Sequence, residues 1–323
     1  MSRAETGLRA GTAGRAKAAG SQSWRTRLRN ERMLVLLALP GILFVLAFNY
    51  VPLLGNLIAF KDYQPFLGIS ASDWVGFSNF SVLFNGDPAF LQALWNTITI
   101  SALQVFFAFP APICIALILN SLLSDRFKNL VQSILYLPHF LSWVIVVAVF
   151  QQMLGNAGLV STFLQNHGHA GLHLIGNVGV FKELLTAQVM WKETGWGTIL
   201  FLAALSRIDA HLYEASAVDG ASRMRQLWHV TLPGIRPVIV LLLILRLGDV
   251  LSVGFEQIVL QQPSVGARAS EVLDTYVYNH GILAGNWGVA AAVGLVKGLL
   301  GLVLVLAANR VAHLFGERGV YQS

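Results

Sequence analysis

The segment YEASAVDGASRMRQLWHVTLP, residues 213–233, is polar and charged, and it lies between two long apolar runs of the chain. Such a segment cannot stay in hydrocarbon, because its charged groups need water or a partner. Its residues nevertheless predict an ordered loop that could serve as a contact site for a partner. Asp209 can cap a first helix, and Asp219-Gly220 can supply the turn that stops it. Ser222 can cap a second helix, and Pro233 is expected to end it.

The composition places the chain in a membrane. Of its 323 residues, 55% are hydrophobic and 12% are charged, whereas about 25% are charged in a typical soluble domain. The mean hydropathy is +0.63. The single cysteine, Cys114, excludes a framework of disulfides within the chain.

Six apolar runs are long enough to cross a bilayer, which takes about 20 helical residues. We therefore predict an all-α, polytopic membrane protein with six transmembrane helices, in a domain that covers residues 33–310. Prolines in the second and third runs are tolerated where neighbouring helices satisfy the freed carbonyls. The predicted spans are 33–58, 93–120, 131–153, 184–206, 238–260 and 289–310.

Lysine and arginine are divided unequally between the two sides that these spans create. Sixteen of the 22 lie in the N-terminal tail, the second gap, the gap at 207–236 and the C-terminal tail. The opposite side holds Lys61, Lys182 and Arg268, with Lys192 near a span end. The positive-inside rule then puts both termini and the 207–236 loop in the cytoplasm, with the chain in the inner (cytoplasmic) membrane. The basic excess is explained by orientation, and no nucleic-acid partner is expected.

The two tails flank this domain. Residues 1–32 predict a basic, disordered cytoplasmic segment beside the membrane lipid, and residues 311–323 a second cytoplasmic tail. The first apolar run is not followed by a small-residue cleavage site of the A-x-A type, and it exceeds 20 residues. It is therefore expected to remain as a span and not to be cleaved as a signal.

The spacing within the loop is recognisable. It resembles the EAA loop of ABC-importer permeases, whose pattern is E-A-A, three residues, Gly, nine residues and I-x-L-P. Ser216 replaces the second alanine and Val230 replaces the isoleucine, and both replacements keep the size of the side chain. The positions in register are Glu214, Ala215, Gly220, Leu232 and Pro233.

The resemblance extends over most of the chain to the LplB-like group of sugar-importer permeases. That group is associated with oligosaccharides and polysaccharide fragments, including uronate-rich ones such as alginate. The resemblance implies a type I ABC importer permease fold, in which two six-span permeases, here different proteins, surround a central cavity. It also implies an ATPase dimer, an extracytoplasmic solute-binding protein that delivers the oligosaccharide, and alternating access. The similar segments are 48–68, 74–84, 95–120, 132–143, 191–205 and 245–298.

The energy source is expected on another subunit. The sequence has no G-x-x-x-x-G-K-[ST] motif and therefore no phosphate cradle of its own. ATP and Mg are expected on the partner ATPase, with no cofactor and no catalytic residue in this chain, which is not predicted to be an enzyme. Ala215, Ser216 and Ala217 predict a small-residue face for docking, and Glu214 a charge-assisted contact. The alternative is a solvated helix whose Glu214 lies in water.

Charged residues within or near the spans are the second group of candidates, here for the substrate path. Arg246 and Asp249 are three residues apart, so on one helical face they could pair, or they could line a cavity that reaches substrate or the partner permease. Lys297 has no acidic residue within four positions. It could pair with Asp249 or the partner, snorkel, or face a wet cavity, where it would suit an acidic sugar. Glu256 could reach interfacial water or line the cavity mouth.

Aromatic rings could stack on the apolar faces of sugar rings, although an interfacial aromatic belt is the alternative for each of them. The external run with His167, His169 and His173 lacks a fixed scaffold and a nearby carboxylate, so no metal site is predicted. The aromatic candidates are Trp143, Trp191, Trp196, Tyr276, Tyr278 and Trp287.

Two other classes of protein compete with the permease hypothesis. An ion-coupled secondary sugar transporter would use Arg246, Asp249 and Lys297 as a charge relay, but it would leave the ordered loop unexplained. A membrane-embedded enzyme or assembly factor would need an acid/base constellation, and none is evident in the sequence.

Overall fold

The computed structural model describes residues 32–122, 124–155, 157–168 and 174–314, with Gly316 and Gly319. The chain divides into two compact units between Gly55 and Asn56, and each is described by itself. The first contains α2 (Arg32–Val45) and the π-helical segment η1 (Leu46–Tyr50); the helical run continues as the 3-10 segment η2 (Val51–Phe60). The predicted tail 1–32 lies outside the described residues except for Arg32, as does most of the tail 311–323 beyond Leu314.

The second unit is helical apart from one short ribbon in the described residues. Its strands, β1 (Lys61–Asp62) and β2 (Asp73–Trp74), are antiparallel, and Lys61 pairs with Trp74. The all-α prediction missed this ribbon. The helical segments are, in order, α3 (Gly68–Ala71), η3 (Ser78–Leu83), α4 (Pro88–Leu103), η4 (Gln104–Ala108), α5 (Pro110–Asn120), α6 (Asp125–Tyr136), η5 (Leu137–Phe140), α7 (Trp143–Leu154), α8 (Leu159–Asn166), α9 (Phe181–Leu205), α10 (Ala210–Val218), α11 (Arg223–Gln226), η6 (Leu227–Thr231), α12 (Leu232–Gly248), α13 (Phe255–Val265), α14 (Ala267–Ser270), α15 (Leu273–Tyr276), η7 (Val277–Leu283) and α16 (Trp287–Leu314).

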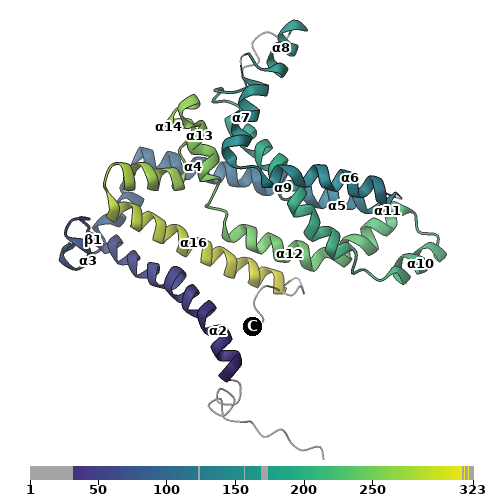
Figure 1. Ribbon diagram of the computed structural model, residues 1–323, viewed down its shortest axis with the longest axis horizontal. Helices are drawn as coiled ribbons and strands as arrows, with labels where there is room; N and C mark the ends of the chain where they lie inside the picture. The colour runs from purple at the N-terminus through teal and green to yellow at the C-terminus, as the bar shows by residue number, and fades with distance from the viewer. Residues whose placement is uncertain are drawn as a thin grey trace, which may run out of the picture. The chain divides into compact units, whose positions relative to one another are not determined.

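Helix α9 is the centre of this unit. It packs against α4, α5, α6 and α12, and α12 packs in turn against α16. In Figure 1, α10 and α11 lie at the right-hand end of the unit, whereas β1, α3 and α14 lie toward the left. The 207–236 loop and the strand ribbon are therefore at opposite ends of the long helices.

Three of the prolines that lie inside long helical runs each follow a π-helical segment. η1 ends two residues before Pro52, η4 two before Pro110, and η6 two before Pro233. Proline has no N–H to donate, and its ring collides with the carbonyl four residues earlier. The wider π turn carries that carbonyl away from the ring. The prediction that Pro233 ends the second loop helix is therefore wrong, because one helical run extends from Arg223 to Gly248.

Five helical runs in the described residues are long and apolar enough to cross a membrane. They confirm the first, second and sixth predicted spans. The first and sixth are longer at both ends, and the second starts earlier, at Pro88. The predicted fourth span, 184–206, coincides with α9, whose 25 residues have the required length but carry Lys192 and Glu193 in the middle. The five runs are Arg32–Phe60, Pro88–Asn120, Trp143–Asn166, Arg223–Gly248 and Trp287–Leu314.

The prediction that residues 131–153 form one transmembrane helix is wrong. Helix α6 ends at Tyr136, and the chain turns a corner at Leu141, whose backbone is extended. Ser142 then caps α7, since its Oγ accepts a hydrogen bond from the N–H of Ile145 at 3.4 Å. A local cap at this corner outweighs the unbroken apolar pattern.

The fifth predicted span, 238–260, is also interrupted. Helix α12 ends at Gly248, and α13 begins only after Gly254. Gly254 has a φ of 66°, a left-handed conformation that glycine adopts without a steric penalty. The segment between them turns the chain, so α12 and α13 are separate helices.

Three clusters of buried apolar side chains join the helices of this unit. They connect α4 with α15 and α16, α4 with α9 and α13, and α5 with α9 and α12. Three buried amides, Gln188, Gln257 and Gln261, add hydrogen bonds of 2.7–3.1 Å between α9 and α13. Many large apolar side chains face outward instead, as expected when the surrounding solvent is lipid.

Helices α6 and α9 approach most closely at Gly195, where an added Cβ would lie 1.9 Å from the carbonyl oxygen of Leu135. Gly195→Ala is therefore expected to push the helices apart and to lower the free energy of unfolding by about 1–3 kcal/mol. Gly294→Ala in α16 is the control, because nothing lies within 4 Å of its added Cβ. Thermal unfolding of the purified protein measures both variants, and equal melting temperatures would contradict the expectation.

Candidate functional site

The first helix of the 207–236 loop, α10, has a cap at each end. At its start, Asp209 Oδ1 accepts a hydrogen bond from the N–H of His211 at 3.0 Å. At its end, Gly220 has a φ of 74°, and its N–H donates to the carbonyl of Ala217 at 3.0 Å. The N–H of Ala221 donates to the carbonyl of Ser216 at 2.9 Å, which completes a Schellman turn. The predicted cap and stop are thus present.

The second helix, α11, begins at the predicted cap. Ser222 Oγ accepts a hydrogen bond from the N–H of Arg225 at 3.4 Å. From there the chain continues through η6 and Pro233 into α12 without interruption. The loop is therefore joined to α12 by a continuous helix.

Side-chain hydrogen bonds tie α10 to the beginning of that helix. The Tyr213 hydroxyl is 3.1 Å from Thr231 Oγ1, and Gln226 Nε2 donates to Ser216 Oγ at 3.0 Å and to the Tyr213 carbonyl at 3.3 Å. Ser216 therefore faces the inside of the loop. The small-residue surface predicted at 215–217 consists of Ala215 and Ala217, because the Ser216 side chain is hydrogen-bonded to Gln226 within the loop.

The other side of α10 is open. The side chain of Glu214 is 72% exposed and lies 3.2 Å from Nδ1 of His211, which is itself exposed. Val218 is 88% exposed, and none of the residues of α10 is buried. The loop thus presents a small apolar surface beside one carboxylate, while its own polar groups are satisfied on the inner side.

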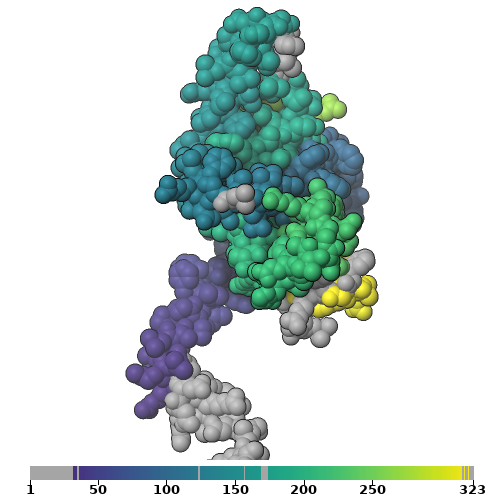
Figure 2. All heavy atoms as spheres, turned by 90° about the vertical axis from the view of Figure 1, so that its right-hand side faces the viewer, coloured from purple at the N-terminus to yellow at the C-terminus, as the bar shows by residue number. Residues whose placement is uncertain are grey.

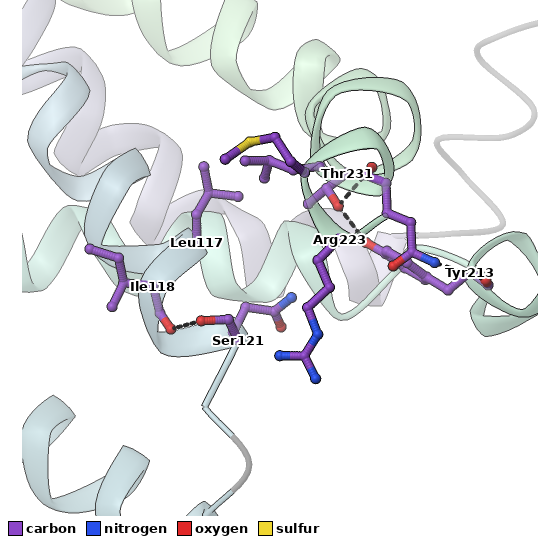
Figure 3. Close-up of a pocket in the computed structure, with 10 residues that line it drawn as sticks. Leu117, Ile118, Ser121, Tyr213, Arg223 and Thr231 are labelled. Atoms are coloured by element: carbon purple, nitrogen blue, oxygen red, sulfur yellow. Dashed lines mark hydrogen bonds between the residues drawn. The ribbon is translucent and has the colours of Figure 1, made fainter. Parts of the chain in front are cut away.

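A cavity of about 460 Å³ separates this loop from the end of α5 (Figure 3). Figure 2 looks onto this end of the unit, where the green spheres of the loop face the viewer. The loop is therefore held by its internal bonds and by its continuity with α12. The cavity is lined by Leu117, Ile118, Asn120, Ser121, Tyr213, Arg223, Met224, Gln226, Leu227 and Thr231.

Of the two alternatives for Arg246, a pair with Asp249 or a place in a cavity lining, the structure shows the second. The Arg246 guanidinium donates a hydrogen bond to the side-chain oxygen of Gln104 on η4. Asp249 lies one residue beyond the end of α12, so the two side chains do not share a continuous helical face. They line different cavities.

Lys297 is paired, but not with Asp249. Its ammonium group contacts Oδ1 of Asp274, which lies in α15. Both side chains line a cavity of about 580 Å³ together with Asp249 and Ser252. Of the alternatives for Lys297, the structure shows a pair across helices, and the acid is Asp274.

The side chain of Arg246 lines another cavity, of about 350 Å³, which we call the Trp196 cavity. Glu193 and Trp196 of α9 line it from one side and Arg246 of α12 from another, with apolar residues of η4 and α5 between them. Trp196 is 46% exposed, and one face of its ring stacks on His139 at 4.6 Å between centroids. The cavity therefore combines an aromatic ring, a guanidinium and a carboxylate.

A polar cluster holds the Trp196 cavity in place. Glu193 Oε2 is 2.8 Å from Nδ1 of His139, and Lys192 Nζ donates to the His139 carbonyl at 2.6 Å. The Lys192 ammonium is 3.6 Å from Glu193 and 5.6 Å from the ring centroid of Trp143. Lys192 thus offsets part of the negative charge of Glu193 and holds the backbone of His139, while Glu193 itself contacts the His139 ring that stacks on Trp196.

The remaining aromatic candidates are scattered. Trp191 is exposed and lies edge-on to Phe150, Tyr278 packs against Phe255, and half-buried Trp287 begins α16. Glu256 is exposed in the first turn of α13. These residues do not converge on the Trp196 cavity.

Tyr276 is a core residue and not part of a substrate path in this structure. It is 2% exposed, and its hydroxyl donates to Asp87 Oδ2 at 3.3 Å. Burial, followed by the charge of Asp87, raises the pKa of Tyr276 to about 12. The phenol therefore stays neutral and remains a donor.

The sequence reasoning missed Gln104 and Asp274 and did not assign Glu193 to a cavity. Glu193 carries a detectable signal, because a carboxylate in the middle of a helix as apolar as α9 needs a partner. Gln104 and Asp274 carry none, since their partners lie 142 and 23 residues away along the chain. No cluster of possible metal ligands occurs in the described residues, and His169 and His173 lie outside them.

Comparison with known proteins identifies the family. Residues 108–318 match the family model described as binding-protein-dependent transport system inner membrane component. The chain belongs to this family. It is thus the membrane permease subunit of an ABC importer, and ATP hydrolysis takes place on separate ATPase subunits. The ion-coupled alternative is not favoured.

Two curated relatives from Bacillus subtilis (strain 168) cover nearly the whole permease. The polygalacturonan/rhamnogalacturonan transport system permease protein YteP is 45% identical over 296 residues, which are 91% of this chain and 92% of YteP. Protein LplB is 42% identical over 300 residues, 93% of this chain and 94% of LplB.

The solved structures agree on the fold. A chain in the crystal structure of a bacterial alginate ABC transporter, in complex with an alginate pentasaccharide-bound periplasmic protein, matches with a TM-score of 0.84 and 35% identity. The match covers 93% of this chain and 100% of that chain. The permease therefore has the type I ABC importer fold.

Proposed function

We propose that this permease moves oligosaccharides or polysaccharide fragments that contain uronic acids from an extracytoplasmic binding protein into the cytoplasm. The supporting observation is the Trp196 cavity. Its ring offers an apolar face for a pyranose, Arg246 offers a guanidinium for a carboxylate, and Glu193 can accept hydroxyl hydrogens. The name of YteP and the alginate transporter structure, both concerned with polymers of uronic acids, support the same class of substrate.

We also propose how the permease is assembled. A second, different six-span permease completes the pathway, and an ATPase dimer docks on α10 from the cytoplasm. The outward side of α10, with Glu214 and Ala215, receives the ATPase, and the helix that continues into α12 carries its movement toward Arg246. Both termini lie on the side of the ATPase, in agreement with the distribution of lysine and arginine. ATP-driven closure then alternates access to the substrate.

The test is the ATPase activity of the reconstituted complex, driven by binding proteins loaded with uronate or with neutral oligosaccharides. We expect stimulation by the uronate-loaded protein. Stimulation by neutral sugars alone would reject the substrate class. Uptake that continues without ATP and collapses with the proton gradient would reject the ATP-driven mechanism.

A further inference from the structure

A further cavity opens at the end of the second unit opposite the 207–236 loop, beside α14 (Figure 1). It has a volume of about 520 Å³, within the range of about 300–1,000 Å³ that is common for small-molecule pockets. Lys182 at the start of α9 and Arg268 of α14 line it, together with Gln92 and Asn96 of α4 and the apolar Val265. We call it the Lys182 cavity.

The two cations of this cavity form no direct ion pair in the part of the chain that the structure describes, although the carboxylate of the adjacent Glu183 lies near enough to Lys182 to favour its charged form. No side-chain hydrogen bond or ion pair within 4 Å is found there for Lys182 Nζ or for the Arg268 guanidinium. Lys61, on the strand ribbon, differs from them, since it donates to the carbonyl of Ser72 at 3.0 Å. Two cations that line one concave space without a direct ion pair favour an anionic group there, since charge-assisted hydrogen bonds are the stronger ones.

Buried polar contacts hold the wall of this cavity. Asn96 is 1% exposed, and its Nδ2 donates to the carbonyl of Arg268 at 3.2 Å and to that of Glu271 at 2.9 Å. Gln92 Nε2 donates to Asn96 Oδ1 at 3.2 Å. The backbone that carries Arg268 is thus fixed to α4, and the oxygen of the Gln92 amide remains available to a hydroxyl donor.

We propose that the Lys182 cavity binds one uronate residue of an acidic oligosaccharide as it enters the permease. Lys182 and Arg268 bind the carboxylate, the Gln92 amide binds a hydroxyl, and Val265 lies against the apolar edge of the sugar. A neutral sugar would leave both cations unpaired, so the cavity also selects for acidic chains. This proposal rests on the proposed function, and it adds a second anion site at the end opposite the loop.

The experiment uses the complete importer in nanodiscs, without ATP and without the binding protein. Tetragalacturonate and its fully methyl-esterified, neutral form are titrated against the wild type and the Lys182→Gln/Arg268→Gln variant. The variant is expected to raise the Kd of tetragalacturonate by about tenfold, the contribution of one charge-assisted hydrogen bond. Its affinity for the neutral ester is expected to stay unchanged.

Two further variants distinguish charge recognition from a structural effect. Lys182→Arg/Arg268→Lys keeps both charges and is expected to bind tetragalacturonate nearly as well as the wild type. Lys61→Gln removes a cation that does not line the cavity, and it is expected to leave the Kd unchanged. A loss of affinity in Lys61→Gln as large as in the double variant would overturn the proposal.

Other outcomes also overturn it. Unchanged affinity for tetragalacturonate in the Lys182→Gln/Arg268→Gln variant would show that the cavity takes no uronate. In a separate docking measurement on the same nanodiscs, weaker binding of the unloaded binding protein to this variant, with unchanged affinity for the sugar, would assign the two cations to a protein contact instead. If uronates still stimulate the ATPase of the wild type in either case, only this inference fails and the proposed function stands.

Discussion

Ala215→Trp is expected to reduce ATP-driven uptake by about 10- to 100-fold while the permease still folds and inserts. Ala215 is exposed on the outward side of α10, away from the hydrogen bonds of Tyr213 and Ser216. An indole at this position meets nothing within the loop, but it prevents close approach of a docked ATPase. Overfilling a packed contact costs about 1–3 kcal/mol, and each 1.4 kcal/mol corresponds to a factor of about ten.

Three measurements separate docking from folding in this variant. Uptake into proteoliposomes gives transport, co-purification gives ATPase binding, and thermal unfolding gives the stability of the permease. Ser216→Ala is the matched control on the inward side of the same helix. It removes two internal hydrogen bonds, one donated to the Tyr213 carbonyl and one accepted from Gln226, and it leaves the outward side intact. Wild-type uptake in Ala215→Trp would show that the ATPase does not dock on this face.

Arg246→Met is expected to raise the KM for an acidic oligosaccharide by about 10- to 100-fold. The substitution removes the guanidinium that lines the Trp196 cavity with Glu193 and keeps much of the volume of the side chain. A charge-assisted hydrogen bond contributes about 1.5–3 kcal/mol, which corresponds to this range. The KM for a neutral oligosaccharide of the same length is expected to change little, because a neutral sugar has no carboxylate to bind the Arg246 guanidinium.

Lys297→Met is the matched control for Arg246→Met. Lys297 is a second cation within the helices, but it pairs with Asp274 in a different cavity. Its loss is expected to destabilise the permease, because the carboxylate of Asp274 is left without its counter-ion, and to affect acidic and neutral sugars alike. Initial uptake rates measured over a range of substrate concentrations test both variants. Selective loss of acidic transport in Lys297→Met alone would place the carboxylate site in the other cavity.

Local features of the fold could be predicted from the sequence to a large extent. Asp209, Gly220 and Ser222 act as the cap, the turn and the second cap that their residue types indicate. Such contacts join residues a few positions apart, so local chemistry is sufficient to predict them. The same holds for α16, whose apolar run matches the sixth predicted span.

Long-range features could not be predicted in this way. The prolines misled the prediction at Pro233, because a π turn relieves the collision that normally ends a helix. The sequence left open whether Asp249 pairs with Arg246 or Lys297, and the structure shows neither pair, since α12 ends at Gly248 and Lys297 contacts Asp274. The distance between two charged groups then depends on the path of the backbone and not on their spacing in the sequence.

By itself, the sequence determined that this chain is a helical membrane protein with an ordered loop between spans, because apolar run length, charge bias and capping residues act locally. Only the tertiary structure decided which side chains share a cavity. Arg246 meets Gln104 and opens beside Glu193 and Trp196, while Lys297 meets Asp274. A charged side chain inside a bilayer pairs with whichever polar group the packing of distant helices brings within reach. That packing depends on many segments of the chain together and cannot be predicted from any one of them.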